Sequence, residues 1–265
     1  MREIRKRVLA GLCLAPPIVF IFCFLPPKGF FIFVVFVSVL AVLELVRMGR
    51  IRHKYLLALL ALLCLVPLYL ESLRVFVLWL LFSPVFYLFA VSLKLHGEND
   101  KVNRDIMAAL NTLFLAELFV VLPLFYFYLL KETGDFYPLI LLFAVWASDI
   151  GAFIFGKNFG KKRLVPAISP KKTYEGLAGA ITGSMVIVGL SGRFLGLGVS
   201  EALALGAMIG ILGQTGDIFE SIWKRVGEVK DSSSLIPGHG GILDRMDSFI
   251  FTAPFLYHYL AGLKV

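Results

Sequence analysis

Acidic side chains gather near the ends of apolar segments in the second half of the chain. Asp244 and Asp247 are spaced i, i+3, so a helix would place both on one face. Asp149 and Asp217 lie at the ends of two other apolar segments, and we expect the four carboxylates to converge at one depth. Ionised carboxylates held this close repel one another, and a cation between them relieves that repulsion. Oxygen ligands without a His or Cys set favour Mg²⁺ over zinc.

A basic segment, residues 156–176, carries six Lys or Arg against the single acid Glu175. Gly156 and Gly160 free the backbone for close approach to a ligand. The stretch 169–173 clusters hydroxyl and ammonium groups beside the start of the next helix, where backbone amides favour phosphate. Charge alone favours a plain solvated loop, but the hydroxyl and glycine pattern shifts the interpretation toward an anion-binding loop.

Together, an acidic metal-competent region and a basic loop predict phosphoryl or nucleotidyl transfer, because the cation neutralises phosphate charge and Lys or Arg stabilise the transition state. The sequence has no GxxxxGK[ST] motif and no Ser/His pair in a triad-like context. His239 lies in a glycine-rich turn three residues after Ile236 and could donate to a phosphate or move a proton.

The amino-acid composition of the whole chain indicates a membrane protein. Of 265 residues, 59% are hydrophobic and 17% charged, against roughly 45–50% and about 25% in soluble domains. A mean hydropathy of +0.87, with long apolar blocks, excludes disorder and a small disulfide scaffold. The net charge of +8 needs no nucleic-acid partner if it reflects membrane orientation, and the three cysteines show no metal-binding spacing.

An all-α polytopic integral membrane protein of about nine transmembrane helices is therefore expected, since a spanning helix needs about 20 mostly apolar residues. The predicted spans are Val8–Leu25, Gly29–Val46, Tyr55–Leu70, Val75–Leu93, Ile106–Leu130, Phe136–Phe155, Leu177–Leu190, Val199–Ile211 continuing toward Phe219, and Ser248–Leu263. Residues 1–130, with short loops and few polar side chains, are interpreted as a scaffold. Residues 131–265 are interpreted as the catalytic region, with cytoplasmic loops at 156–176 and 213–247.

Basic residues set the orientation. With a cytoplasmic N-terminus and an outside C-terminus, nearly all Lys and Arg fall in the inside segments, as the positive-inside rule requires. The five left outside are Lys28, Arg74, Lys131, Arg193 and Lys264.

Two acids fall within the predicted spans of the first half. Glu44 lies one turn from a predicted cytoplasmic helix end, where its side chain can snorkel to water. Glu117 lies mid-span, where an acid is costly, and we keep open both a functional role and a structural hydrogen bond.

Residues 148–247 carry longer motifs that resemble the phosphatidate cytidylyltransferases, the CDP-diacylglycerol synthases. The motifs are the stretches SIWKR at 221–225, KD at 230–231 and PGHGGILDRMD at 237–247, together with GD at 216–217, SD at 148–149 and SPKKTYEG at 169–176. Trp223 stands where the family usually has an aliphatic residue or Phe. Residues 1–130 resemble the family only in hydropathy and span layout.

The resemblance implies transfer of the cytidylyl group of CTP to phosphatidic acid, giving CDP-diacylglycerol and pyrophosphate. It implies a Mg²⁺ requirement, with a second cation also possible, and a homodimer in membrane lipid. The location implied is a bacterial cytoplasmic (inner) membrane, with the active site facing the cytoplasm. The residues assigned by the resemblance are Asp217, Asp244, Asp247 and Asp149 for metal; Lys161, Ser169, Lys171 and Lys172 for substrate phosphate; and Lys224, Arg225, Lys230, Asp231, His239 and Arg245 for catalysis.

Two other functions fit parts of the sequence. A CTP-dependent kinase of a polyprenol or phytol would need the same spans, acids and basic loop, but would yield a phosphorylated alcohol. An ion-coupled transporter could line its path with Asp149, Glu117 and Asp217, although no inverted hydropathy repeat supports it. A lipid-binding scaffold without activity would leave the convergent acids unexplained.

Overall fold

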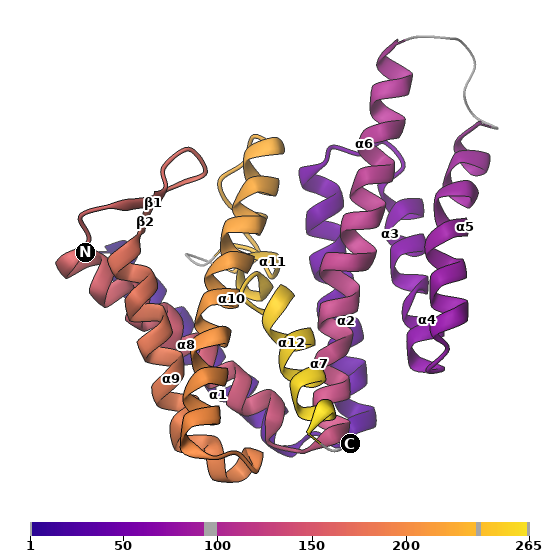
Figure 1. Ribbon diagram of the computed structural model, residues 1–265. Helices are drawn as coiled ribbons and strands as arrows, with labels where there is room; N and C mark the ends of the chain where they lie inside the picture. The colour runs from indigo at the N-terminus through magenta and orange to yellow at the C-terminus, as the bar shows by residue number, and fades with distance from the viewer. Residues whose placement is uncertain (1, 93–99, 237–239, 264–265) are drawn as a thin grey trace.

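Helices make up most of the protein. In the computed structural model, the backbone is described at residues 2–92, 100–236 and 240–263, and the side chains at 13–92, 102–236 and 240–263. Figure 1 shows long, steeply inclined helices joined by short turns at two opposite ends of the molecule.

The first half contains seven α-helices and one π-helical turn. They are α1 (Arg2–Phe24), α2 (Pro27–Met48), α3 (Lys54–Leu63), α4 (Leu65–Tyr69), α5 (Leu73–Ser92), α6 (Asp100–Ala116), η1 (Glu117–Val121) and α7 (Leu122–Thr133). Two proline effects are visible in this half. The ring and missing N–H of Pro67 disfavour continuing α3 past Leu63, and Pro123 cannot donate to the Phe119 carbonyl within the π turn.

The second half contains five α-helices and one hairpin. They are α8 (Tyr137–Phe159), β1 (Arg163–Val165), β2 (Ser169–Thr173), α9 (Tyr174–Leu195), α10 (Val199–Val226), α11 (Leu243–Met246) and α12 (Phe249–Gly262). The strands are antiparallel, with Arg163 opposite Thr173 and Val165 opposite Ser169. Thr173 ends the hairpin and caps α9, because its Oγ1 accepts the Gly176 N–H at 3.0 Å.

The nine predicted spans each fall on a helix, and six helices in the described part of the chain are long and apolar enough to cross a membrane. These six are Pro27–Met48, Leu73–Ser92, Val102–Thr133, Tyr137–Phe159, Tyr174–Leu195 and Val199–Val226. The remaining predicted spans fall on α1, whose described side chains begin at Cys13, on the consecutive helices α3 and α4, and on α12. The all-α prediction is wrong at the β1–β2 hairpin, where the Gly160 and Pro170 backbone interrupts helix formation.

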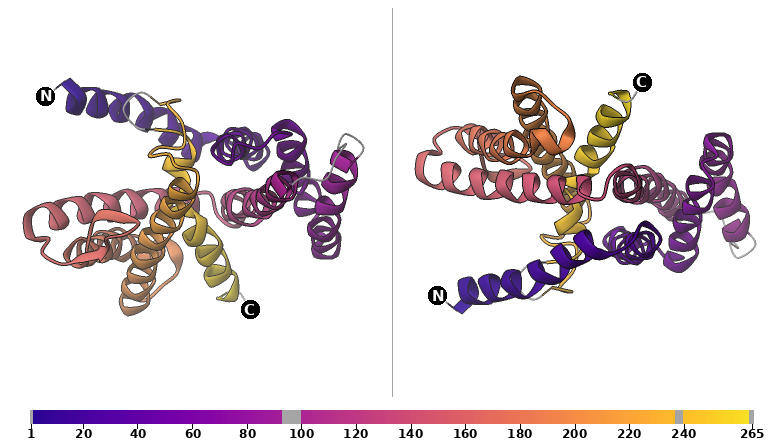
Figure 2. Two further views of the ribbon diagram at one scale, coloured as in Figure 1. Left: turned by 90° about the horizontal axis from the view of Figure 1, so that it is seen from above. Right: turned by 90° about the horizontal axis from the view of Figure 1, so that it is seen from below.

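Packing divides the helices into two groups that α12 joins. Helices α8, α9 and α10 pack consecutively, whereas α2, α3 and α7 form a second group, and α12 contacts both α10 and α7. Figure 2 shows this division from above and below, with α8, α9 and α10 fanning out on one side. Short α11 packs against α2.

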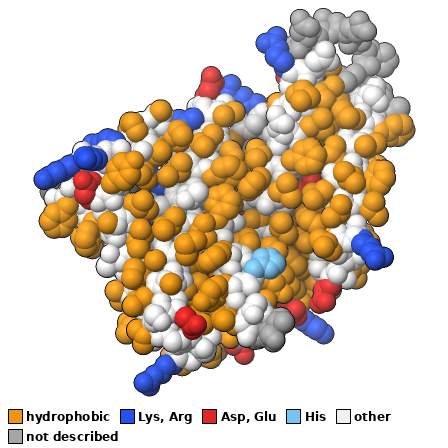
Figure 3. All heavy atoms as spheres, in the orientation of Figure 1, with side chains coloured by type: hydrophobic (Ala, Val, Ile, Leu, Met, Phe, Trp, Pro, Cys, Tyr) orange, Lys and Arg blue, Asp and Glu red, His pale blue; other side chains and the backbone are white. Residues whose placement is uncertain are grey.

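Apolar side chains fill the core and also cover the outside. Phe30, Phe127, Leu141 and Leu256 are almost completely buried. The face in Figure 3 is mainly hydrophobic, with charged side chains mostly near its upper and lower margins. An apolar exterior of this kind suits a surface in contact with lipid.

Candidate functional site

The last turns of α10 carry the acids of the site. The helix continues to Val226, so residues 213–226, which the sequence analysis placed in a cytoplasmic loop, are helical. Asp217, Glu220 and Lys224 follow one another at i, i+3 and i+7 and therefore share one face. The helix thus positions two carboxylates and one ammonium group in a row.

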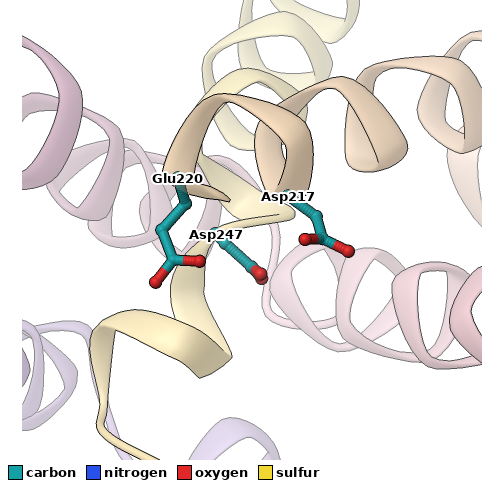
Figure 4. Close-up of side chains that lie close together, drawn as sticks. All are labelled: Asp217, Glu220 and Asp247. Atoms are coloured by element: carbon teal, nitrogen blue, oxygen red, sulfur yellow. The ribbon is translucent and has the colours of Figure 1, made fainter. Parts of the chain in front are cut away.

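Asp247 joins this face from the turn between α11 and α12. A Cβ at Gly216 would collide with the Asp247 carbonyl oxygen, so the glycine permits this close approach. Carboxylate oxygens of Asp217, Glu220 and Asp247 lie within 4.8 Å of one another, and Figure 4 shows the three side chains converging. We call these residues the three-acid cluster.

The three-acid cluster is poor in hydrogen-bond donors. Glu220 is 0% exposed, and within the described part of the chain neither of its oxygens accepts a hydrogen bond of good geometry, although Lys224 forms an ion pair with Oε2. The Ser248 N–H donates to Asp247 Oδ1 at 2.6 Å. Burial, followed by the charges of Asp217, Glu220 and Asp149, raises the pKa of Asp247 well above its ordinary value.

The oxygen donor set fits a hard divalent cation. The cluster has three carboxylates, and Mg²⁺ sites are built from one or two carboxylates completed by substrate phosphate and water. One third of the Asp217 side chain is exposed, which leaves a path for such ligands. Among the described residues, Glu220 Oε1 has neither a hydrogen bond nor an ion pair, which is a further sign that the protein alone does not complete the site.

Two lysines flank the cluster. Lys172, at the end of the hairpin, forms an ion pair with Asp217 at 2.8 Å and donates to the Gln214 carbonyl and Oε1 at 3.2 and 3.0 Å. Lys224 bridges Glu220 and Asp244, with 2.8 Å between its Nζ and Asp244 Oδ1. The predicted basic loop therefore meets the acids, as expected for a site that binds anionic substrates beside a cation.

Asp244 lies beside the cluster but outside the three acids that could share one ion. Its Oδ2 accepts hydrogen bonds from the Ser232 N–H at 2.9 Å and the Gly241 N–H at 2.8 Å, and Ser232 Oγ lies 2.9 Å from the same oxygen. Burial opposes ionisation of Asp244, but the Lys224 hydrogen bond and these backbone donors outweigh it and lower its pKa. Asp244 therefore holds Ser232 and Gly241 in place, and its role as a metal ligand stays a prediction.

Glu44 reaches the same segment from α2. It is 3% exposed and accepts hydrogen bonds from Ser233 Oγ at 2.6 Å and Ser232 Oγ at 2.8 Å. The N–H groups of Leu243 and Ile242 donate at 2.9 and 3.0 Å. The snorkelling interpretation of Glu44 is wrong, because these four donors keep the carboxylate inside the protein rather than in water.

The other predicted residues surround the cluster. Asp149, on α8, is exposed and receives a 3.5 Å hydrogen bond from Gln214 Nε2. Exposed Arg225 donates from Nε to the Ile168 carbonyl at 3.2 Å, which ties α10 to the hairpin turn. The remaining described residues are half-buried Ser169 and exposed Lys161, Lys171, Lys230, Asp231 and Arg245. His239 lies outside the described residues.

Glu117 and Trp223 lie apart from the three acids. Glu117, in the π turn, is 0% exposed, and its two oxygens accept no hydrogen bond within the described part of the chain. Ser83 and Trp79 lie beside the carboxylate, so both the structural and the functional role of Glu117 stay predictions. Trp223 packs edge-on against Phe219 and Phe119, which accounts for an aromatic residue at that position.

Fold and site together define the class: an integral membrane protein that gathers acids and lysines at one end of its helices, suited to a divalent cation and phosphate groups. Residues 5–263 match the cytidylyltransferase family, and the chain belongs to that family. The sequence resemblance noted above is thereby confirmed.

Three bacterial relatives, each named phosphatidate cytidylyltransferase, show how far the likeness extends. The Bacillus subtilis (strain 168) protein is 40% identical over 153 residues, 56% of each chain. The Synechocystis sp. protein is 46% identical over 133 residues, 49% of this chain and 45% of the relative. The Staphylococcus haemolyticus protein is 44% identical over 140 residues, 52% of this chain and 54% of the relative. The chain spans about half the length of the curated relatives it matches.

Proposed function

We propose that this protein transfers the cytidylyl group of CTP to phosphatidic acid and releases pyrophosphate. The observation that carries the proposal is the three-acid cluster, with oxygens within 4.8 Å of one another and lysines on two sides. Membership of the cytidylyltransferase family supports the nucleotide, and the names of the three relatives support the lipid acceptor.

In this proposal, Asp217, Glu220 and Asp247 hold Mg²⁺, which supplies charge neutralisation for the substrate phosphates. Asp244 and Asp149 border the site. An oxygen of the phosphatidate phosphate forms a bond to the α-phosphorus of CTP as the bond to the bridging oxygen of pyrophosphate breaks. The attacking phosphate oxygen is already ionised at neutral pH, so this chain needs no covalent nucleophile.

The lysines and arginine around the cluster bind and orient the anions. Lys172 can exchange its contact with Asp217 for a substrate phosphate, because the lysine is only partly buried and its ammonium carries three donors. Exposed Lys161, Lys171 and Arg225 place positive charge beside the same end of α10 and stabilise the leaving pyrophosphate. Lys224 forms an ion pair with Glu220 and holds its carboxylate in position.

The membrane arrangement is part of the proposal: nine crossings, a cytoplasmic N-terminus, an outside C-terminus and a site that faces the cytoplasm. In Figure 1 the hairpin and the α2–α3 turn lie at the upper end, whereas the α7–α8 and α9–α10 turns lie at the lower end. The upper connections are those rich in Lys and Arg, which supports a cytoplasmic upper end. The bacterial relatives support a bacterial inner membrane, and a homodimer follows from the family resemblance alone.

The test is an assay of the purified protein in detergent with CTP, phosphatidic acid and Mg²⁺. We expect CTP labelled at the α-phosphate to give a labelled lipid, and CTP labelled at the γ-phosphate to give labelled pyrophosphate. Asp217→Asn should abolish the labelled lipid. Asp105→Asn, an exposed acid on α6, serves as the matched control.

Transfer of the γ-label to an added polyprenol would overturn the proposal in favour of a lipid kinase. Formation of neither product by the folded protein would overturn transferase activity altogether. Equal activity of Asp217→Asn and Asp105→Asn would contradict the assignment of the three-acid cluster as the cation site.

A further inference from the structure

We infer that Glu44 is a positioning residue for the three-acid cluster, and this inference rests on the proposed function. Glu44 belongs to the first half of the chain, where Glu117 alone was considered for a functional role. Its carboxylate nevertheless receives four hydrogen bonds from the segment that precedes and begins α11.

Glu44 joins residues 232–233 to residues 242–243. Oε1 accepts from Ser233 Oγ and the Ile242 N–H, and Oε2 accepts from Ser232 Oγ and the Leu243 N–H. These donors lie about ten residues apart in the sequence, so one carboxylate joins both ends of the segment. Gly241 permits the fit, because a Cβ there would collide with the Glu44 carboxylate and with Ser232 Oγ.

Ser232 links Glu44 to Asp244, because its hydroxyl reaches Glu44 and its backbone N–H donates to Asp244. Ser232 Oγ lies 2.8 Å from Glu44 Oε2 and 2.9 Å from Asp244 Oδ2, and it has a single proton to donate. Asp244 Oδ2 already accepts the backbone N–H groups of Ser232 and Gly241. The hydroxyl proton therefore serves Glu44, whose Oε2 has only the Leu243 N–H besides it among the described donors.

Asp244 and Lys224 connect the Glu44 contacts to the three-acid cluster. Asp244 Oδ1 accepts from Lys224 at 2.8 Å, and the same ammonium pairs with Glu220. Glu44, Ser232, Asp244, Lys224 and Glu220 thus form a continuous chain of contacts that ends in the three-acid cluster. Outer partners of this kind orient metal ligands, and their loss typically weakens metal binding about 10- to 100-fold.

Glu44→Gln is the decisive variant. Glutamine has nearly the same shape, but one acceptor oxygen becomes an NH₂ donor facing two other donors. At least one of the Ile242 and Leu243 N–H groups then loses its acceptor, and the segment rearranges. Glu44→Asp keeps the charge and both acceptors at a shorter reach, so it should restore part of the wild-type behaviour. Glu71→Gln, an exposed acid at the α4–α5 turn, is the matched control.

The primary measurement is Mn²⁺ binding by electron paramagnetic resonance, with Mn²⁺ as the probe for the divalent site. We expect Glu44→Gln to raise the Mn²⁺ dissociation constant by about tenfold or more, Glu44→Asp by less, and Glu71→Gln not at all. The half-saturating Mg²⁺ concentration in the transferase assay should rise in parallel. A variant that merely folded less well would lose signal amplitude and rate without a shift in either constant.

Hydrogen exchange of the backbone amides locates the effect. Glu44→Gln should accelerate exchange at residues 240–246 and leave the hairpin at 163–173 unchanged. Unchanged Mn²⁺ affinity in Glu44→Gln would overturn the inference, as would absence of Mn²⁺ binding by the unaltered protein. If the unaltered protein binds Mn²⁺ but makes no CDP-lipid, the proposed function fails, while the shift in Mn²⁺ affinity still decides the role of Glu44.

Discussion

Two neighbouring groups of acids in this protein, one buried and one partly exposed, differ in how their oxygens are satisfied. Glu44 and Asp244, here called the anchored pair, have hydrogen-bond donors on all four carboxylate oxygens. In the three-acid cluster, Asp217 pairs with Lys172 and Asp247 accepts from the Ser248 N–H, while Glu220 lacks a well-formed hydrogen bond. Lys224 contacts both groups.

The difference shows which acids the protein satisfies by itself. A buried carboxylate costs free energy unless donors or a cation compensate it. The anchored pair is compensated within the fold and shapes a segment of irregular backbone. The three-acid cluster is incompletely compensated, which is the condition for binding an added cation.

The largest difference between the groups should appear when a cluster acid is neutralised. We expect Asp247→Asn to lower CDP-lipid formation by at least about 100-fold, because it removes one ligand of the proposed Mg²⁺ site. The protein should still elute from size-exclusion chromatography in detergent like the wild type. Wild-type rates in Asp247→Asn would remove Asp247 from the site.

Replacing the bridging lysine should damage both groups at once. Lys224→Met leaves Glu220 and Asp244 without their shared ammonium, and removal of one partner of a buried pair costs about 3–5 kcal/mol. We expect a clear fall in the thermal unfolding midpoint in detergent, together with a loss of activity. Lys28→Met, at an exposed lysine on α2, provides the comparison. Unfolding midpoints that match in the two variants would show that the bridge contributes little.

The two groups should also respond differently to pH. The pKa of Asp247 is raised by burial and by the neighbouring carboxylates, so its proton must leave before a cation binds, and Mg²⁺ affinity should fall as pH falls through that raised pKa, by up to about tenfold per unit. The pKa of Asp244 is lowered, so its stabilising bonds are present above the ordinary aspartate pKa and are lost only below it. Mg²⁺ titrations at several pH values measure the slope. A pH-independent affinity in these titrations would show that Asp247 does not limit cation binding.

The smallest effect should come from trimming the anchored pair. Ser233→Ala removes one of four donors to Glu44, and a single hydrogen bond contributes about 0.5–1.5 kcal/mol. We expect the transferase rate to stay within about threefold of the wild type. Exposed Ser234→Ala should change nothing measurable. A loss in Ser233→Ala as large as that in Glu44→Gln would mean that Ser233 itself contacts substrate.

Sequence patterns predicted most of the helices, because a membrane-spanning helix must be long and apolar along its whole length. The points at which helices end or change their hydrogen-bonding pattern are harder to predict. The end of α3 before Pro67 and the π turn at Glu117–Val121 depend on local backbone sterics within otherwise uniform apolar runs. The β1–β2 hairpin was not predicted, because the composition of its residues suits an irregular basic loop equally well.

The sequence predicted the general location of the site, but not which acids lie together or which donors they contact. Asp217 and Asp247 were expected to converge, and they do. Glu220 was missed, although its i+3 spacing from Asp217 would have placed it on the same face once α10 was extended. Glu44 could not be paired with its donors, because contacts between residues so far apart in sequence leave no local pattern. Glu44 accepts four hydrogen bonds and Glu220 accepts none of good geometry within the described residues. The sequence shows both simply as glutamate and cannot distinguish them.

The long separation between Glu44 and its partners also bears on how the chain is made. Ser232 follows Glu44 by 188 residues, so at about 5–20 residues per second the ribosome needs roughly 10–40 s to supply the first donor. During that interval the carboxylate has to remain solvated. Its place one turn before the end of α2 keeps it within reach of water until then. The acid is therefore among the last side chains of its helix to be buried, and its hydrogen bonds to Ser232, Ile242 and Leu243 can form only after synthesis of the C-terminal half.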